Sequence, residues 1–231
     1  MEKTGITVHC IVRNEDHFVW FALQSVLPFV DRIVVYDTGS TDQTVPIIKS
    51  IASEKITLVE KGKVTAAQYV ALRQEMIEKT ITQFFLVVDG DEIWPEESIK
   101  KLVETAKNLP EEKIAVVCRT RNCVGDVWHY QPEEAGDYHL AGRRGHLTMR
   151  LFKKVSGLTI SGEYPLESYN LFGQSLNDQN DKLFFLDTWY LHATHLVRSS
   201  NGEKVPGFRK QKLETGITFS KAELPTVLFT S

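Results

Sequence analysis

Residues 84–92 join an apolar run to an acidic turn and read Phe84-Phe85-Leu86-Val87-Val88-Asp89-Gly90-Asp91-Glu92. A continuous apolar run is typical of a strand that is covered on both faces in a parallel sheet. In such a sheet, ligands bind beyond the carboxyl ends of the strands. Asp89 and Asp91 could share a hard divalent cation there, because these cations prefer oxygen ligands. The other interpretation is a solvated acidic turn in front of the helix that begins near Pro95.

The rest of the first half alternates strand and helix patterns. The predicted strands are Ile6–Val12, Arg32–Tyr36, Ile56–Glu60, Phe84–Val88 and Ile114–Arg119. Between them lie helical patterns that start at Phe18, after a cap at Thr41 or Asp42, at Thr65, and with Pro95 in the first turn. This alternation predicts right-handed βαβ units and hence an α/β fold with a mostly parallel sheet.

The pattern changes after about Arg119. Residues 122–146 lack periodicity and are expected to form a long functional loop, whose aromatic residues from Trp128 onward suit a sugar or acceptor pocket. Residues 146–153 and 182–191 then read as strands, and the apolar end of the chain, 224–229, is expected to dock on the body. We predict one domain over 1–231, with a nucleotide-binding half at about 1–118, an acceptor half at about 119–198 and a tail at 199–231.

A second motif lies where a predicted strand turns into a helix, and it reads Val34-Val35-Tyr36-Asp37-Thr38-Gly39-Ser40-Thr41-Asp42-Gln43-Thr44. A carboxylate at the strand end, Asp37, can accept hydrogen bonds from a base or a sugar hydroxyl. Gly39 lets the backbone approach a ligand closely, and a helix amino terminus favours phosphate. Helix capping would explain Ser40, Thr41 and Asp42, but it does not explain Asp37.

With these motifs, the runs Cys10-Ile11-Val12-Arg13-Asn14-Glu15 and Val30-Asp31-Arg32-Ile33-Val34-Val35 closely resemble the amino-terminal half of family 2 glycosyltransferases. The match covers most of residues 5–95. It implies the GT-A fold, a Rossmann-like, mostly parallel sheet flanked by helices, with an acceptor-side extension. It also implies inverting transfer from a nucleotide sugar, expected to be a UDP-sugar.

The resemblance assigns four residues to the nucleoside, and Gly39 joins them because of its place in the turn after the second predicted strand. Val12, Arg13 and Glu15 would border the nucleoside pocket, and Asp37 would bind the base, which is expected to be uracil. Gly39 would admit the nucleotide close to the backbone.

Further residues would serve the diphosphate and a metal ion. Arg73 matches an Arg that the family carries on the helix before the D-x-D strand, and it would lie near the nucleotide; a solvated surface charge is the alternative. Asp89 would contact ribose or metal, and Asp91 would hold Mn²⁺ or Mg²⁺ against the diphosphate. Many relatives carry a metal-reaching His at the place of His192 and His195, and either could be a further ligand.

The acceptor half resembles the family less closely. An inverting transfer needs a carboxylate that takes the proton of the acceptor. Glu167 lies near the position of a family Glu, although Leu166 stands where His is usual, and Glu163 is the second candidate. Arg198, Lys204, Arg209 and Lys210 would form a cationic lid or a solvated basic tail.

Composition limits the partners and the location. Lys plus Arg total 27 against 30 for Asp plus Glu, and the net charge of -3 lacks the basic footprint of a nucleic-acid-binding protein. No apolar run is long enough to span a membrane, and no secretory signal opens the chain. Cys10, Cys118 and Cys123 form no disulfide framework, which favours a reducing compartment. We expect a cytoplasmic protein, with peripheral contact at the inner face of the membrane left open.

The predicted function is therefore metal-dependent transfer of a sugar to a carbohydrate, lipid-linked or other acceptor. One alternative is a catalytically silent protein that only binds a nucleotide sugar. The other is a nucleotidyltransferase, but that class needs a Gly-rich phosphate loop after the first strand, and residues 12–16 contain no glycine.

Overall fold

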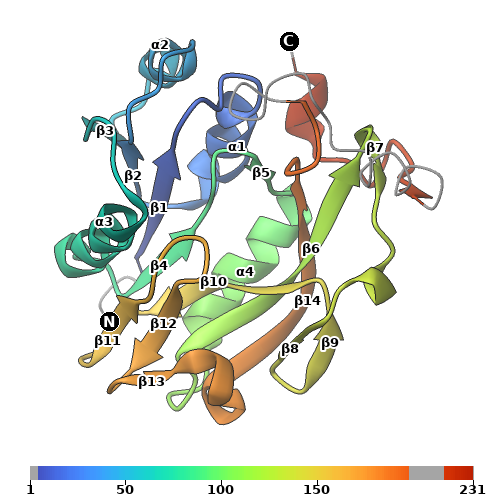
Figure 1. The fold of residues 1–231 in the computed structure, drawn as a ribbon. Helices are drawn as coiled ribbons and strands as arrows, with labels where there is room; N and C mark the ends of the chain where they lie inside the picture. Colours follow the sequence, from blue (N-terminus) through green and yellow to red (C-terminus); the bar gives the residue numbers. More distant parts are fainter. Residues whose placement is uncertain (1–4, 198–215, 231) are drawn as a thin grey trace.

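The computed structural model describes residues 5–197 and 216–230 (Figure 1). Its first half alternates strands and helices as the sequence predicts. The elements are β1 (Ile6–Val12), α1 (Val19–Val26), η1 (Leu27–Phe29), β2 (Arg32–Asp37), α2 (Thr44–Ser50), β3 (Ile56–Glu60), α3 (Ala66–Lys79), β4 (Phe84–Val87), β5 (Glu92–Ile93) and α4 (Glu96–Asn108).

The second half is built mainly from strands. They are β6 (Ala115–Val124), β7 (Asp126–Tyr130), β8 (Tyr138–Leu140), β9 (Arg143–Gly145), β10 (Leu147–Lys153), β11 (Leu158–Ser161), β12 (Ser168–Leu171), β13 (Gln174–Ser175), β14 (Leu183–His192) and β15 (Ile217–Thr218), with short 3-10 turns η2 (Glu133–Ala135), η3 (Leu176–Asp178), η4 (Asn180–Lys182) and η5 (Thr226–Phe229). Residues 122–146 therefore do not form one long loop. They contain the end of β6 and three further strands, which are too short to show a period in the sequence.

Within the described residues, ten strands form one sheet, in the order β15-β7-β6-β10-β4-β1-β2-β3, with β14 beside β6 and β5 beside β14. The strands β1 to β4 run parallel to one another, and β14 runs parallel to β6. The antiparallel strand β10 lies between β4 and β6. The strand order reverses at β1, which pairs with β2 on one side and with β4 on the other. A ligand site is expected at such a point, beyond the carboxyl ends of β1 and β4.

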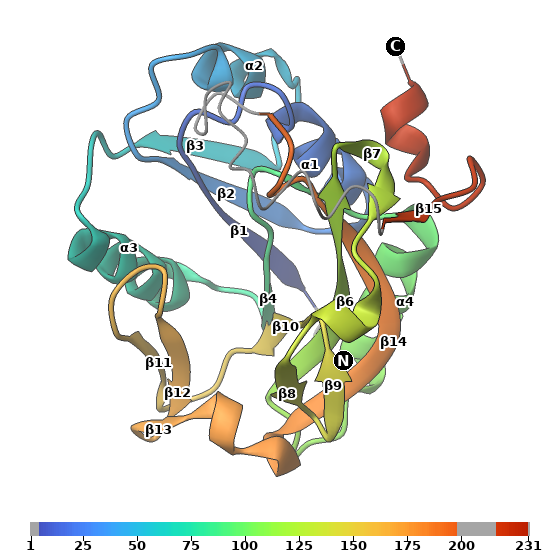
Figure 2. The same ribbon diagram turned by 45° about the vertical axis from the view of Figure 1, so that its right-hand side comes forward.

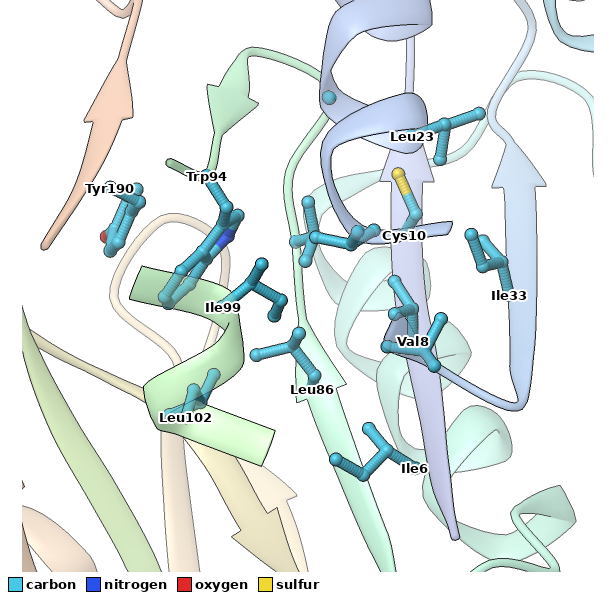
Figure 3. Close-up of a cluster of buried hydrophobic side chains, with 14 of the residues drawn as sticks. Ile6, Val8, Cys10, Leu23, Ile33, Leu86, Trp94, Ile99, Leu102 and Tyr190 are labelled. Atoms are coloured by element: carbon cyan, nitrogen blue, oxygen red, sulfur yellow. The ribbon is translucent and has the colours of Figure 1, made fainter. Parts of the chain in front are cut away.

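The two faces of the sheet carry different layers (Figure 2). Alternate residues of β1 explain this, because successive side chains of a strand point to opposite faces. Ile6, Val8 and Cys10 belong to one buried cluster with residues of α1, α2 and α4. Figure 3 shows them with Leu23 of α1 and with Ile99 and Leu102 of α4. The opposite face packs against α3 and against the small sheet β11-β12-β13.

The helix starts agree with the predictions in part. Thr65 caps α3 with a capping box, in which Gln68 is the reciprocal partner. Helix α2 begins later than expected, after Gln43, so neither Thr41 nor Asp42 is its N-cap residue, although Asp42 accepts a hydrogen bond from the Thr44 amide at 3.0 Å. Pro95 lies at the N-cap of α4 and not within its first turn.

The end of the chain docks on the body, as predicted. Phe219 and Leu224 are buried with Ile93 and Leu191. Arg121 lies 3.9 Å from the ring centroid of Trp189 and 5.3 Å from that of Phe219, so cation–π contacts hold this segment against the sheet. All three cysteines are buried and free. Among the described residues, none of the helices has the length and apolar character needed to cross a bilayer.

His9 is a buried titratable residue in the middle of β1. It is 1% exposed, its ring stacks on Phe85 at 4.5 Å, and its Nε2 lies 2.6 Å from the Thr80 hydroxyl. Burial, together with the nearby charges of Arg73 and Lys154, lowers the pKa of His9 to about 3. The imidazole is therefore neutral in the folded protein, whereas it binds a proton near pH 6.5 in the unfolded chain.

We predict that His9 lowers the free energy of unfolding as the pH drops below 6.5, because only the unfolded chain then binds its proton, whereas Glu92, whose pKa is raised, acts in the opposite direction over the same interval. The contribution of His9 between pH 6.5 and 4.5, measured in urea titrations as the difference between wild type and His9→Gln, should be up to about 2–3 kcal/mol. The His9→Gln variant should lose clearly less over the same interval, whatever its stability at pH 7.5. His17→Gln, at a half-exposed histidine, serves as the control and should keep the wild-type slope. Equal slopes for wild type and His9→Gln would contradict the assignment.

Candidate active site

A cavity of about 830 Å³ lies beyond the carboxyl ends of β1 and β4. It separates the predicted site residues into two groups. Those that line it are Arg13, Glu15, Arg73, Asp89, Asp91, Glu167 and His192. Those that do not line it are Val12, Asp37, Gly39, Glu163 and His195. The basic residues Arg198, Lys204, Arg209 and Lys210 lie outside the described residues.

Asp89 follows β4 and lies between two arginines. Its Oδ1 is 2.6 Å from Nη2 of Arg73, and its Oδ2 is 3.5 Å from Nη1 of Arg150. Burial alone would raise the pKa of Asp89, but Arg73 and Arg150 outweigh it and hold this pKa below its usual range. Arg73 is 4% exposed, so it is a buried partner of the D-x-D turn and not a solvated surface charge.

Arg150 was not identified as a site residue from the sequence, although it lies within the predicted strand 146–153. The pairing of β10 with β6 shifts register between Met149 and Leu151, and such a bulge redirects the side chain at its centre. Arg150 thereby reaches Glu92 as well as Asp89, and its Nε donates to the Tyr190 hydroxyl at 2.9 Å.

Glu92 is fully buried and accepts the Asp89 amide at 3.1 Å. Burial raises the pKa of Glu92 to about 7, and the positive charge of Arg150 opposes this shift. The guanidinium group of Arg150 therefore contacts both Asp89 and Glu92, the first and last residues of the acidic turn.

Asp91, the second carboxylate of the turn, meets His192. Asp91 Oδ2 lies 3.4 Å from Nε2 of His192, and the Ala193 amide donates to the Asp91 carbonyl at 2.9 Å. Burial tends to lower the pKa of His192, but Asp91 dominates and raises it. His195 lies in the turn after β14, outside the cavity lining.

A turn after β2 holds Asp37 and Gly39, two residues that the sequence predicts to contact the nucleotide. Asp37 is 3% exposed, and its Oδ2 accepts the amides of Gly39 at 3.0 Å and Ser40 at 3.1 Å. Gly39 has φ +89°, and a Cβ there would lie 2.9 Å from the Lys63 backbone nitrogen, so only glycine fits without strain. Asp37 thus caps this turn itself, whereas the sequence predicted a capping role only for Ser40, Thr41 and Asp42.

The predicted base candidates differ in their surroundings. Glu167 is partly buried and lines the cavity, and its Oε2 is enclosed without a hydrogen-bond partner among the described residues. Glu163 is exposed and lies in the preceding turn, where its carbonyl accepts the Leu166 amide at 2.6 Å.

The aromatic residues of the cavity were only partly predicted. Tyr138 and His139 of the segment 122–146 line it, but Trp128 packs against Phe229 and Tyr130 against Phe219 at the end of the chain. Tyr69, Tyr164 and Tyr169 were missed. Among residues 5–197 and 216–230, no group of three or more His, Cys, Asp or Glu side chains is arranged to hold a metal ion.

The family model described as glycosyl transferase family 2 matches residues 7–164, which is more than half of the chain. The chain belongs to glycosyl transferase family 2. The matched region of this family 2 member includes the D-x-D turn and Arg150 but ends before Glu167 and His192.

Among curated proteins, the chain is similar to the SPbeta prophage-derived glycosyltransferase SunS of Bacillus subtilis (strain 168). The two are 31% identical over 104 residues, which is 45% of this chain and 24% of SunS. The SunS protein of Bacillus phage SPbeta matches equally. The chain thus spans about a quarter of the length of these relatives.

Two solved structures share the fold. S. aureus TarS 1-349 in complex with UDP-GlcNAc has a TM-score of 0.57 at 13% identity, covering 87% of this chain and 62% of that one. Glucosyl-3-phosphoglycerate synthase from Mycobacterium tuberculosis, in complex with Mn²⁺, UDP and glucosyl-3-phosphoglycerate, has a TM-score of 0.52 at 16% identity, covering 82% and 72%. At this identity the likeness concerns the fold, which is the predicted GT-A architecture.

We predict that Arg150→Met destabilises the protein by about 3–5 kcal/mol, because Glu92 is left buried without its cation. The double variant Arg150→Met/Glu92→Gln should be more stable than Arg150→Met alone, since the neutral amide can still accept the Asp89 amide. Urea unfolding at pH 7.5 measures both. Arg119→Met removes a more exposed arginine with two acidic partners and should cost at most about 1 kcal/mol. If the double variant is less stable than either single variant, the loss of stability in Arg150→Met does not come from an unpaired Glu92.

Proposed function

We propose that this family 2 glycosyltransferase transfers a sugar from a UDP-linked donor, with inversion, to an acceptor on a carbohydrate, a lipid-linked sugar or another molecule, and that it uses Mn²⁺ or Mg²⁺. One observation carries the proposal: Asp91, His192 and Glu167 line a single cavity at the point where the strand order reverses. The likeness to folds that bind UDP-GlcNAc, or UDP with Mn²⁺, supports the choice of donor and cation.

The donor set at Asp91 fits a hard divalent cation. Asp91 Oδ2 and His192 Nε2 lie 3.4 Å apart, close to the spacing of about 3 Å between adjacent ligands of one cation with bonds of about 2.1 Å. Such cations commonly take only one or two protein ligands and complete their shell with phosphate oxygens and water. A bound cation would neutralise the charge that develops on the diphosphate leaving group. Asp89, whose two oxygens face arginines, is better suited to a ribose hydroxyl than to the cation.

The nucleoside would lie at the end of the cavity that Arg13 and Glu15 line, next to Val12, Asp37 and Gly39, which are not part of this lining. Asp37 Oδ1 has one distant amide neighbour, Ser40 at 3.3 Å, so lone pairs are left for an N–H of the base. Arg73 would support this end through Asp89, whose carboxylate it holds in place.

Glu167 would take the proton of the acceptor. A general base needs a carboxylate that faces the substrate and is not already neutralised by a cation. Among the described residues, no ion pair joins Glu167 to an arginine, lysine or histidine, in contrast to Asp89 and Asp91. Tyr69 and Tyr164, whose rings lie 4.4 Å apart at the cavity wall, offer aromatic surface for a sugar ring near this carboxylate.

We predict that UDP raises the melting temperature only when Mn²⁺ or Mg²⁺ is present, because the ligand binds the native state through the cation. Thermal shift with UDP plus metal, UDP plus chelator, and metal alone measures this. Asp91→Asn should remove the metal-dependent rise in melting temperature. Glu104→Gln, at an exposed carboxylate on α4, is the control and should keep it. An equal UDP shift in excess chelator contradicts the metal role, and a preference for GDP corrects only the base.

We predict that Glu167→Gln lowers turnover by about 10²–10⁴-fold while donor and metal affinity stay nearly unchanged, because the amide keeps the shape but takes no proton. Glu163→Gln is the matched control in the same segment and should keep wild-type turnover. Donor hydrolysis and single-turnover transfer measure the chemical step, and UDP titration measures binding. If only Glu163→Gln abolishes transfer, the base is Glu163; if neither variant does, the base lies elsewhere in the cavity.

A further inference from the structure

We propose that Asn122 is a positioning residue for His192, and that its amide oxygen fixes the imidazole so that Nε2 faces the cation beside Asp91. The inference rests on the cation of the proposed function. It concerns a residue on β6, the strand that pairs in parallel with β14.

Strand register brings the two side chains together. The parallel pairing of β14 with β6 places His192 opposite Asn122, and the pairing of β14 with β5 places it opposite Glu92 on the other side. Asn122 Oδ1 lies 3.1 Å from His192 Nδ1. The imidazole is therefore held between the amide on one side and Asp91 on the other.

Two further groups orient the amide of Asn122. Its Nδ2 lies 3.4 Å from Oε1 of Gln131 and 3.2 Å from Nδ1 of His146. An amide nitrogen only donates hydrogen bonds, and both of these neighbours can accept one. Gln131 is 4% exposed, and its backbone amide donates to the Asn122 carbonyl at 2.9 Å, so it is fixed in place. The amide oxygen is thus the atom that faces His192.

The orientation determines which nitrogen of His192 can bind a cation. A neutral imidazole carries one N–H. Because Asn122 Oδ1 can only accept a hydrogen bond, it favours the form of His192 that carries the hydrogen on Nδ1. The lone pair then lies on Nε2, which is 3.4 Å from Asp91 Oδ2. Hydrogen-bond partners of this kind fix the tautomer of a ligating histidine, and their loss typically costs about 10–100-fold in metal affinity.

The experiment measures Mn²⁺ affinity in the presence of UDP, from the loss of the free Mn²⁺ signal in electron paramagnetic resonance. Asn122→Leu, which keeps the size but removes the acceptor, should weaken Mn²⁺ binding by about 10–100-fold. Asn122→Asp, which keeps an acceptor at the same place, should bind Mn²⁺ within about threefold of wild type or more tightly. The exposed Asn108→Leu on α4 is the control for the substitution itself and should bind as wild type does.

A double-variant comparison separates positioning from general damage. In a His192→Gln background, Asn122→Leu should cause no further loss, because the group that it positions is gone. If Asn122→Leu does not fold, Asn122→Ala takes its place in both comparisons. Wild-type affinity in folded Asn122→Leu, or an equal loss in Asn122→Asp, overturns the inference alone. A folded wild-type protein that binds no Mn²⁺ with UDP refutes the cation of the proposed function and this inference with it.

Discussion

The carboxylate of Asp89 lies between the guanidinium groups of Arg73 and Arg150, and this buried arrangement holds the candidate site together. Arg73 comes from α3 on one face of the sheet, and Arg150 comes from the antiparallel strand β10. The two arginines are buried, and an unpaired charge there would be strongly unfavourable, so Arg73 depends on Asp89, whereas Arg150 is shared between Asp89 and Glu92. The acidic turn after β4 can therefore take few other positions, and Asp91 is directed toward β14.

Strand pairing extends the constraint to the rest of the site. The short strand β5 pairs with the end of β14, so the residues after the acidic turn and His192 belong to one hydrogen-bonded unit. Gly90 fits the same arrangement, since a Cβ there would lie 2.9 Å from Val12 at the end of β1. The acidic turn thus packs against the end of β1, next to the proposed nucleoside site. The proposed donor site therefore depends on two features of this turn: the pairing of β5 with β14 and the close approach of Gly90 to Val12.

The second half of the chain places an antiparallel strand within the sheet. β10 enters between β4 and β6 in the antiparallel direction and brings its bulged Arg150 to the carboxyl end of β4. The segments on either side of β10, with β8 before it and β11 and β12 after it, supply the tyrosines and Glu167 that form the far wall of the cavity. This wall comes from the second half of the chain and packs against α3 of the first half, where the Ile160 amide donates to Gln74 Oε1 at 3.0 Å.

The sequence by itself determined the first half of the fold. Continuous apolar runs such as Ile6–Val12 and the capping residue Thr65 act over a few neighbouring positions, and their consequences are local. The same holds for Asp89 and Asp91, because a strand end followed by an acidic turn is visible in a short stretch. The short strands of 122–146 escaped detection, since three to five residues are too few to display a period.

Only the tertiary structure decided which side chains meet. Arg150 and Asp89 are far apart in the chain, and the bulge that joins them leaves no periodic signal. The pairing of His192 with Asn122 comes from the register of two strands separated by 70 residues. It distinguishes His192 from His195, which the sequence left equal. The hydrogen bonds from the amides of Gly39 and Ser40 to Asp37 were also visible only in the structure. They depend on the backbone angles of the turn, which residue type alone does not fix.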